Sequence, residues 1–281
     1  MSVSGGIFIV PLYTLLQERS RPEVRSQVIA ANNVMNSFFM IGASVVLIAF
    51  YALDFSLPNI FLGFALMNGV VAIYIYTVVP EFFLRFVAWV LVRMMYRVKV
   101  TGIENIPRKG PALLACNHVT FVDWLVIGGS CPRPTVFIMY YKFFQIPLLQ
   151  TLMKQAKVIP ICSAKENPEI LQEAMVAIEE ALNNDEVVCI FPEGTLTSDG
   201  QRSPFRQGIC RIVEKTPVPV VPMSLSGLWG SIFSKQEGAR WLRPISRFWR
   251  KIDLHIHPPI QPDKLRLDGL KEIIESKIHK P

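Results

Sequence analysis

Charged residues are scarce in this sequence. Asp, Glu, Lys and Arg make up 18% of its 281 residues, and the first 80 residues hold only three acids and three bases. Apolar residues account for 51% of the chain, and its mean hydropathy is +0.35. This composition excludes an intrinsically disordered chain and a collagen. It predicts membrane-spanning segments in the front part, followed by a folded domain that carries the whole net charge of +7.

Cysteine is scarce as well, and no two cysteines share a C-x-x-C spacing. All of them follow residue 115, and most lie in or beside apolar runs, as buried reduced thiols do. Zinc sites and disulfide frameworks need closer or paired spacings. The sequence therefore predicts neither a metal site nor a disulfide among Cys116, Cys131, Cys162, Cys189 and Cys210.

Two long stretches, residues 34–53 and 57–79, contain no charged residue. Each is long enough to cross a hydrocarbon core of about 30 Å, which takes roughly 20 helical residues. Bases precede the first stretch and follow the second, whereas the link at 54–56 holds none. By the positive-inside rule both ends then face the cytoplasm. The sequence predicts a multi-pass anchor in the inner, cytoplasmic membrane, no cleaved signal peptide, and a domain on the cytoplasmic side.

Residues 81–99 differ from these stretches because arginines interrupt the apolar residues. Arg85, Arg93 and Arg97 break up a series of apolar side chains that recur at helical spacing. This pattern is typical of a helix that lies in the membrane interface, with its arginines toward lipid phosphates. The alternative is a helix that packs on its own domain. In both cases residues 81–99 join a membrane segment, 1–80, to a domain at 100–281.

From residue 100 onward, short apolar runs alternate with helical patterns. Helices are expected at 169–183, 205–214 and 263–278, and the first has apolar residues on one face and acids on the other. Such alternation over about 180 residues predicts an α/β domain with a mixed sheet flanked by helices. The runs expected to form strands are 112–117, 135–140, 158–162, 187–192, 218–225 and 252–257.

His118 follows one of these apolar runs, and Asp123 comes five residues later. On one continuous helix these two side chains would point in different directions. If His118 ends a strand and Asp123 begins the next helix, the turn between them brings the carboxylate onto the imidazole. The carboxylate would then fix the ring tautomer and raise the basicity of the other nitrogen. Such a pair can deprotonate a substrate hydroxyl; the alternative is a histidine with a purely structural role.

Two further groups follow the ends of predicted strands. Glu193 opens a Glu-Gly-Thr turn after the run at 187–192, where a carboxylate and backbone donors would line a cleft. Nearby bases could bind an anionic group, because arginine forks and helix N-termini favour phosphate. The alternatives are an ordinary turn with Glu193 in solvent, and bases that are merely solvated. The basic side chains in question are Lys142 and Arg206, with Arg202 and Arg211 as alternatives.

Three motifs, in this order and spacing, resemble those of the glycerophospholipid acyltransferase family. They are Asn117-His118-x4-Asp123, Phe191-Pro192-Glu193-Gly194-Thr195 and Val220-Val221-Pro222-Met223. The resemblance covers about residues 96–260 and implies that His118 is a general base oriented by Asp123. It also implies that Glu193 and Gly194 belong to the loop that binds the acceptor, with Pro222 beyond the next strand. The residues expected to bind substrate are Asn117, Lys142, Glu193, Gly194, Thr195, Arg206 and Pro222.

A second resemblance concerns the front of the chain. Residues 25–36 resemble the last part of a major facilitator superfamily transporter of the lysophospholipid-transporter branch. Residues 227–231 are similar to the acyltransferase branch that is fused to such transporters. The resemblance implies that residues 1–80 are a transporter remnant that serves as an anchor, since carriers of this kind need both halves. A third apolar run, at residues 5–16, is short for a membrane span, and from it we expect Met1 to lie partway through what was once a longer membrane protein.

The chain departs from the family pattern in two places. Leu196 follows the Gly-Thr pair where many members have arginine, and the second family motif is reduced to residues 158–163 with Lys165 after them. Both places are associated with the phosphate of the acceptor. Leu196 therefore favours lysophosphatidylethanolamine over lysophosphatidic acid as the acceptor, with Arg202, Arg206 or Lys165 as substitute phosphate ligands.

The sequence thus predicts a membrane-bound O-acyltransferase. It would move an acyl chain from acyl-CoA or acyl carrier protein to the free hydroxyl of lysophosphatidylethanolamine or lysophosphatidic acid, with no metal or other cofactor. The basic domain suits an anionic lipid, the phosphates of CoA or an acidic carrier protein. The alternatives are a non-catalytic lysolipid-binding or transport accessory and an acyl thioesterase. A nucleic-acid partner is not expected, because no basic run is interleaved with aromatic residues.

Overall fold

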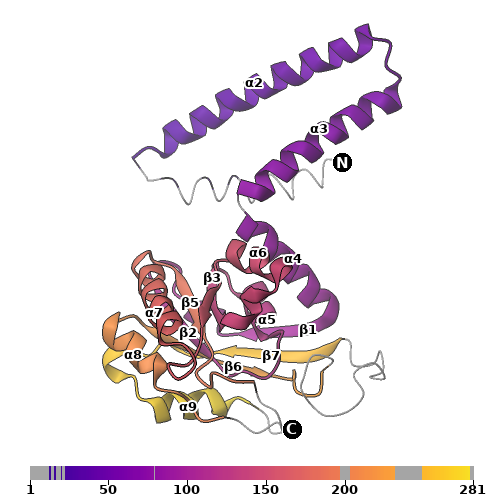
Figure 1. The fold of residues 1–281 in the computed structure, drawn as a ribbon. Helices are drawn as coiled ribbons and strands as arrows, with labels where there is room; N and C mark the ends of the chain where they lie inside the picture. The colour runs from indigo at the N-terminus through magenta and orange to yellow at the C-terminus, as the bar shows by residue number, and fades with distance from the viewer. Residues whose placement is uncertain are drawn as a thin grey trace. The chain divides into compact units, whose positions relative to one another are not determined.

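The computed structural model describes residues 23–78, 80–196, 203–231 and 249–278, together with Tyr13, Leu16 and Ser20. The chain forms two compact units, Met1–Tyr74 and Ile75–Pro281. The first unit contains helix α2 (Arg25–Ala52) and most of helix α3 (Leu57–Val78), joined by a short turn (Figure 1).

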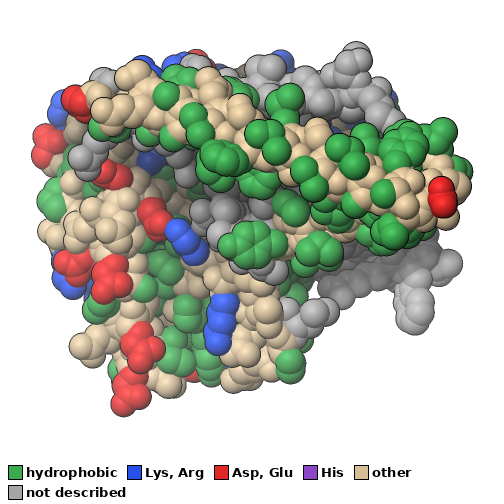
Figure 2. Space-filling model, turned by 90° about the horizontal axis from the view of Figure 1, so that it is seen from above, with side chains coloured by type: hydrophobic (Ala, Val, Ile, Leu, Met, Phe, Trp, Pro, Cys, Tyr) green, Lys and Arg blue, Asp and Glu red, His purple; other side chains and the backbone are tan. Residues whose placement is uncertain are grey.

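Both helices of the first unit are long and apolar enough to cross a membrane. Phe38, Phe39 and Met40 of α2 are each more than 60% exposed, and Figure 2 shows hydrophobic side chains along the two helices with almost no charge. Keeping apolar surface in water is unfavourable by about 25 cal/mol per Å², whereas lipid tails would cover it. The two charge-free stretches are therefore helices of the expected length and polarity.

The second unit is built around one seven-stranded sheet (Figure 1). The strand order is β1-β7-β6-β2-β5-β3-β4, and all neighbours are parallel except β6 and β7. The predicted mixed sheet is confirmed, and all six predicted runs contribute strands. The bounds are β1 (Tyr96–Thr101), β2 (Ala112–Cys116), β3 (Thr135–Tyr140), β4 (Ile159–Ile161), β5 (Val187–Ile190), β6 (Val220–Ser226) and β7 (Arg250–Ile256).

Helices cover both faces of this sheet and create two hydrophobic cores. Strand β2 is fully buried, and its successive side chains enter different cores. Leu114 packs in the core that includes residues of α4 and α5. Leu113 packs in the core that includes residues of α7, α8 and α9, and Figure 1 shows these helices around the sheet. A strand covered on both faces is apolar at every position, which is why the run at 112–117 was recognisable. The helices are α4 (Pro80–Met95), α5 (Asp123–Ser130), α6 (Pro147–Gln155), α7 (Pro168–Asn183), α8 (Gly208–Lys215) and α9 (Leu267–Ser276), with short 3-10 turns η1 (Ile103–Asn105), η2 (Tyr141–Gln145) and η5 (Pro262–Lys264).

The predicted helical segment at 81–99 needs a correction at its end. Helix α4 stops at Met95, and the next residues form edge strand β1, which pairs with β7. Tyr96 is buried in the core, and Val98 and Val100 pack against it, while Arg97 and Lys99 alternate with them. This period of two is that of a half-buried strand. Arg97 and Lys99 directly follow an apolar helix, so in the sequence they resemble the charged end of that helix, and the period of two is hard to recognise.

Helix α4 has one side packed on the domain and another that is exposed. Ala88 and Val92 are buried, and a Cβ on Gly129 of α5 would lie 3.2 Å from the Trp89 Cα, so the two helices approach closely. Phe86 and Met94 are more than 60% exposed. The packing alternative therefore holds for one side of α4, and the apolar character predicted for an interfacial helix remains on the other.

A buried polar chain ties the end of β7 to α9. His257 Nε2 donates to Ser224 Oγ at 2.7 Å, and Ser224 Oγ donates to the Ile274 carbonyl at 2.6 Å. His257 is 7% exposed. Burial, together with the neighbouring His255 and Lys277, lowers the pKa of His257 to about 4. The imidazole is therefore neutral in the folded domain at pH 7.

We expect this histidine to make the domain less stable in acid. The unfolded chain binds a proton near pH 6.5 and the folded chain only near pH 4. The contribution of His257 to the free energy of unfolding is therefore fully present above pH 6.5. Up to roughly 3 kcal/mol of this free energy is lost as the pH falls toward 4. Thermal unfolding of the detergent-solubilised chain at pH 7.5 and 4.5 should show a smaller pH effect in His257→Gln than in the wild type. An equal pH effect in both would contradict this account.

Candidate active site

His118 and Asp123 meet at the carboxyl end of the central strand β2. Strand β2 ends at Cys116, and helix α5 begins with Asp123. The chain turns between them, so that His118 Nδ1 lies 2.8 Å from Asp123 Oδ2. The contact expected from the strand-turn-helix interpretation is therefore present. Parallel strands commonly place binding sites at this edge of a sheet.

The carboxylate of Asp123 is fixed by the turn that it closes. Its side chain is fully buried and accepts hydrogen bonds from the N–H groups of Val119 and Thr120, at 2.6 and 2.9 Å, and from Thr120 Oγ1 at 2.6 Å. These donors compensate the cost of burying an ionised carboxylate. Asp123 can therefore only accept from His118, so Nδ1 carries the proton and Nε2 carries the free lone pair.

Phe191 fixes the plane of the His118 ring. The two ring centroids are 4.1 Å apart, and the planes differ by 18°. Phe191 follows strand β5, the neighbour of β2 in the sheet. The His118 side chain is 20% exposed. One face of the imidazole is therefore stacked, one nitrogen is hydrogen-bonded, and the remaining edge is open to a ligand.

Glu193 links the loop after β5 to the His118 turn. Its Oε1 accepts from the His118 N–H at 3.3 Å, and the residue is only 2% exposed. The alternative of a solvated Glu193 is therefore wrong. Gly194 has a φ of +64°, and its N–H donates to the Phe191 carbonyl, which closes a tight turn. Thr195 Oγ1 donates to Ser203 Oγ at 3.3 Å.

Of the predicted bases, Arg206 lies at this loop. Its N–H donates to the Pro192 carbonyl at 2.8 Å, and its Nε is 3.0 Å from the position that a Cβ on Gly194 would occupy. Lys142 instead pairs with Glu166 at 3.1 Å, in η2 after β3. Arg211 is exposed on α8, and Arg202 lies outside the described residues.

Two residues expected to bind substrate are engaged with the sheet. Asn117 is buried, donates to the Leu225 carbonyl at 2.9 Å and accepts from the Leu225 N–H at 2.7 Å. It therefore ties the end of β2 to β6. Pro222 is buried inside β6, opposite Ala115 of β2, and not beyond the strand as expected. Strand β6 continues through this proline and stays paired with β2 on one side and β7 on the other.

Thr120 was missed from the sequence, although a signal was there. The spacing Thr120-x-x-Asp123 is a capping-box signature, in which an acid reaches back to the N–H three residues earlier. The structure has this bond, and Thr120 Oγ1 also accepts from the Val122 N–H at 3.4 Å. Helix α5 itself begins at Asp123 after Val122 and has no side-chain cap, so these bonds close the turn before the helix and immobilise the carboxylate of the site.

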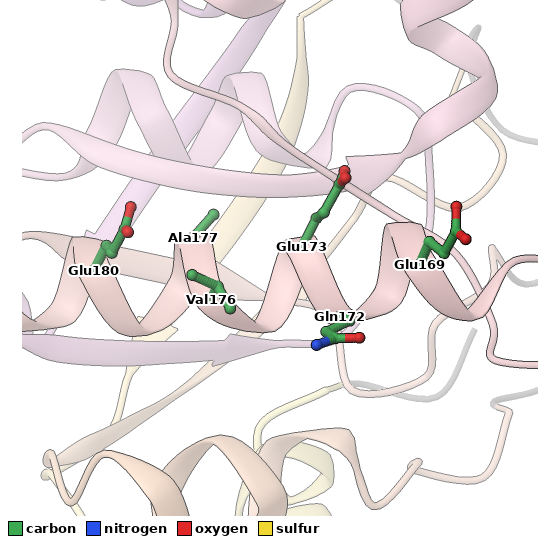
Figure 3. A pocket seen from close by; sticks show the side chains of 6 residues that line it. All are labelled: Glu169, Gln172, Glu173, Val176, Ala177 and Glu180. Carbon is green, nitrogen blue, oxygen red and sulfur yellow. The ribbon is translucent and has the colours of Figure 1, made fainter.

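A shallow pocket along α7 is a separate feature (Figure 3). It is lined by one face of the helix, and three of its six lining side chains are carboxylates. Such a lining repels anionic ligands, and it includes none of the predicted site residues. The lining residues are Glu169, Gln172, Glu173, Val176, Ala177 and Glu180.

Comparisons with known proteins agree with the motifs. Residues 97–226 match the family model for acyltransferases. The chain is 32% identical over 133 residues to the chloroplastic 1-acyl-sn-glycerol-3-phosphate acyltransferase BAT2 of Brassica napus, covering 47% of this chain and 38% of that protein. It is 26% identical over 190 residues to the 1-acyl-sn-glycerol-3-phosphate acyltransferase of Borreliella burgdorferi, covering 66% of this chain and 71% of that protein. The chain thus spans less than two-fifths of the length of the plant relative.

The fold also has a counterpart among solved structures. The crystal structure of the 1-acyl-sn-glycerophosphate (LPA) acyltransferase PlsC from Thermotoga maritima superimposes with a TM-score of 0.52 at 24% identity, covering 64% of this chain and 70% of that one. The residues matched by the family model lie in the α/β domain, and the resemblance of residues 1–80 to a transporter stays a prediction. Residues 97–226 therefore carry an acyltransferase domain that is similar to the domains of the glycerophospholipid acyltransferase family.

Proposed function

We propose that this protein is a membrane-bound O-acyltransferase that transfers an acyl chain from a thioester to the free hydroxyl of a lysophospholipid. The observation that carries the proposal is the His118 Nδ1–Asp123 contact of 2.8 Å, which presents Nε2 as a base at the carboxyl edge of the sheet. The names of the similar proteins support a 1-acylglycerol-3-phosphate acceptor. Lysophosphatidylethanolamine is the competing acceptor.

In this reaction His118 first accepts a proton and later donates it. His118 Nε2 takes the proton of the acceptor hydroxyl as its oxygen bonds to the thioester carbonyl carbon. The tetrahedral intermediate then collapses, the carbon–sulfur bond breaks, and His118 returns the proton to the leaving thiolate. Asp123 stabilises the imidazolium that exists between these steps. The products are a diacyl phospholipid and free CoA or free carrier protein, and no metal or redox cofactor takes part.

Arg206 replaces the arginine that the family pattern has at position 196. It lies against Gly194, just before α8, on the loop that Glu193 joins to His118. A guanidinium there can pair with the acceptor's phosphate while the hydroxyl reaches His118. Because position 196 is a leucine, the arginine that binds the phosphate in this account is Arg206, ten positions later in the sequence.

The membrane segment brings the domain to its substrate. Helix α3 ends at Val78 and α4 begins at Pro80, so a single residue separates the apolar helix from the first helix of the domain. On α4, Trp89 is 47% exposed and the Arg93 guanidinium lies 5.7 Å from its ring centroid, a combination that suits the lipid headgroup region. We infer a multi-pass protein of the cytoplasmic membrane whose domain meets lysolipids from the cytoplasmic side and its acyl-CoA or acyl carrier protein donor from the cytoplasm.

The first prediction from this account concerns the base itself. His118→Ala should lower the rate of diacyl product formation at least about 100-fold, since a general base contributes about 10² to 10⁴ in rate. Asp123→Asn keeps the side-chain size and removes the charge, so a loss of the same kind is expected. The assay uses membranes containing the full chain, a radiolabelled acyl-CoA or acyl carrier protein thioester, and lysophosphatidic acid, lysophosphatidylethanolamine or no acceptor.

His255→Gln provides a matched control. His255 is bonded to Thr101 at 2.6 Å in β1 and has no part in the proposed reaction, so activity should persist. Free fatty acid without any acceptor would identify a thioesterase in place of a transferase. Product that forms equally well in His118→Ala would contradict the proposal and favour a non-catalytic lipid-binding role.

A second prediction concerns Gly194. A Cβ on Gly194 would lie 3.0 Å from the Arg206 Nε, and the backbone there is left-handed. Gly194→Ala should therefore strain the turn by about 1 kcal/mol and displace the Arg206 side chain. We expect the KM for the lysolipid to rise several-fold while the KM for the thioester changes little. Gly208→Ala is the control, because its Cβ would have no atom within 4 Å. Equal effects on both substrates would contradict a specific role for this turn in acceptor binding.

A further inference from the structure

A lysine ammonium lies beside two tyrosine rings and a carboxylate at the surface, at the end of β3. The rings of Tyr140 and Tyr141 are nearly perpendicular, with an angle of 77° and centroids 5.2 Å apart. The Lys142 Nζ lies 5.4 and 5.8 Å from these two centroids. It also lies 3.1 Å from Glu166 Oε1. Two aromatic walls and an anion around one cation form the arrangement by which proteins recognise organic ammonium ions.

The walls of this cage are braced by hydrogen bonds. Glu166 Oε1 accepts from the Tyr140 hydroxyl at 2.5 Å and from the Tyr141 hydroxyl at 3.3 Å. The Tyr140 hydroxyl, with the Lys142 ammonium second, lowers the pKa of Glu166, so the carboxylate stays ionised. Glu166 comes from the segment between β4 and α7, whereas Tyr140 ends β3 and Tyr141 begins η2. The cage is therefore assembled by the fold from two separate segments.

The present occupant of the cage is a side chain that can leave. Lys142 is 54% exposed on a flexible stem of four carbons. A ligand ammonium that replaced it would keep the charge pairing with Glu166 and the contact with both rings. The released Lys142 would gain a new anionic partner if the ligand carried a phosphate next to its ammonium. Exchange of one ammonium for another therefore leaves no charge uncompensated.

The cage lies at the same edge of the sheet as His118. In the strand order, β5 separates β2 from β3, so the ends of β2 and β3 are about 10 Å apart at the usual strand spacing. Phe121, in the turn between His118 and Asp123, contacts Phe143 beside Lys142, with ring centroids 6.3 Å apart. A molecule that reached from His118 to the cage would cross the loop carrying Glu193, which follows β5.

We propose that Tyr140, Tyr141 and Glu166 form a subsite for the primary ammonium of a zwitterionic acceptor headgroup, such as that of lysophosphatidylethanolamine. The inference rests on the proposed acyl transfer and adds the residues that choose the acceptor. The glycerol hydroxyl lies at His118, the phosphate lies between Arg206 and the displaced Lys142, and the ammonium enters the cage. Lysophosphatidic acid has no ammonium and leaves Lys142 in place.

The test compares two acceptors in the full chain reconstituted in lipid nanodiscs. We expect Glu166→Gln and Tyr141→Leu each to lower the ratio of kcat/KM for lysophosphatidylethanolamine to that for lysophosphatidic acid by about tenfold. In Glu166→Gln, Lys142 is no longer held by a carboxylate, so kcat/KM for lysophosphatidic acid should not fall in parallel. Glu186→Gln is the matched control, because Glu186 pairs with Lys157 at 3.0 Å with nearly the same exposure of both side chains.

A binding measurement without turnover completes the test. Glycerophosphoethanolamine should show saturation transfer to its ammonium-bearing methylene protons in wild type and in Glu186→Gln, and should lose it in Glu166→Gln. An unchanged acceptor ratio, or an equal loss with both acceptors, would overturn the subsite and leave the cluster a purely structural role. Wild type that acylates neither acceptor would instead contradict the proposed function.

Discussion

The arrangement of the site depends on one buried carboxylate, that of Asp123. It receives two backbone N–H groups and a hydroxyl from its own turn, and the remaining donor is the His118 ring. An ionised group with 0% exposure is stable only when its acceptor sites are filled. The turn between β2 and α5 must therefore keep this shape, and with it the position and tautomer of His118 are determined.

The sheet supplies the rest of the geometry. Strands β2, β5 and β3 are parallel neighbours, so the groups that follow them, His118, Glu193 and Lys142, emerge at one edge. Helices pack on both faces of β2 and so support this edge of the sheet. The proposed base, the proposed phosphate-binding Arg206 and the proposed ammonium subsite thus follow one another along one edge, in the order of the corresponding groups of a lysophospholipid.

Much of this was predictable because local signals agreed with the fold. Buried strands such as β2 are continuous apolar runs, and the His118–Asp123 contact followed from a strand-turn-helix interpretation. Strand β1 was missed because its polar face carries Arg97 and Lys99 beside an apolar helix. The pairing of Lys142 with Glu166 could not be read from the sequence either, since it joins segments on both sides of β4. Asn117 and Pro222 belong to the motifs, but the first is hydrogen-bonded to β6 and the second lies inside β6, so both act in the sheet.

The most direct test of the central claim is the protonation state of the His118 ring. The chain contains only four histidines, so nitrogen-15 NMR of histidine-labelled protein can be assigned with the His118→Ala variant. In the neutral ring we predict that Nδ1 carries the proton and that Nε2 carries none, and that Asp123→Asn weakens this preference. A His118 ring protonated at Nε2, or a tautomer mixture unaffected by Asp123→Asn, would contradict the account.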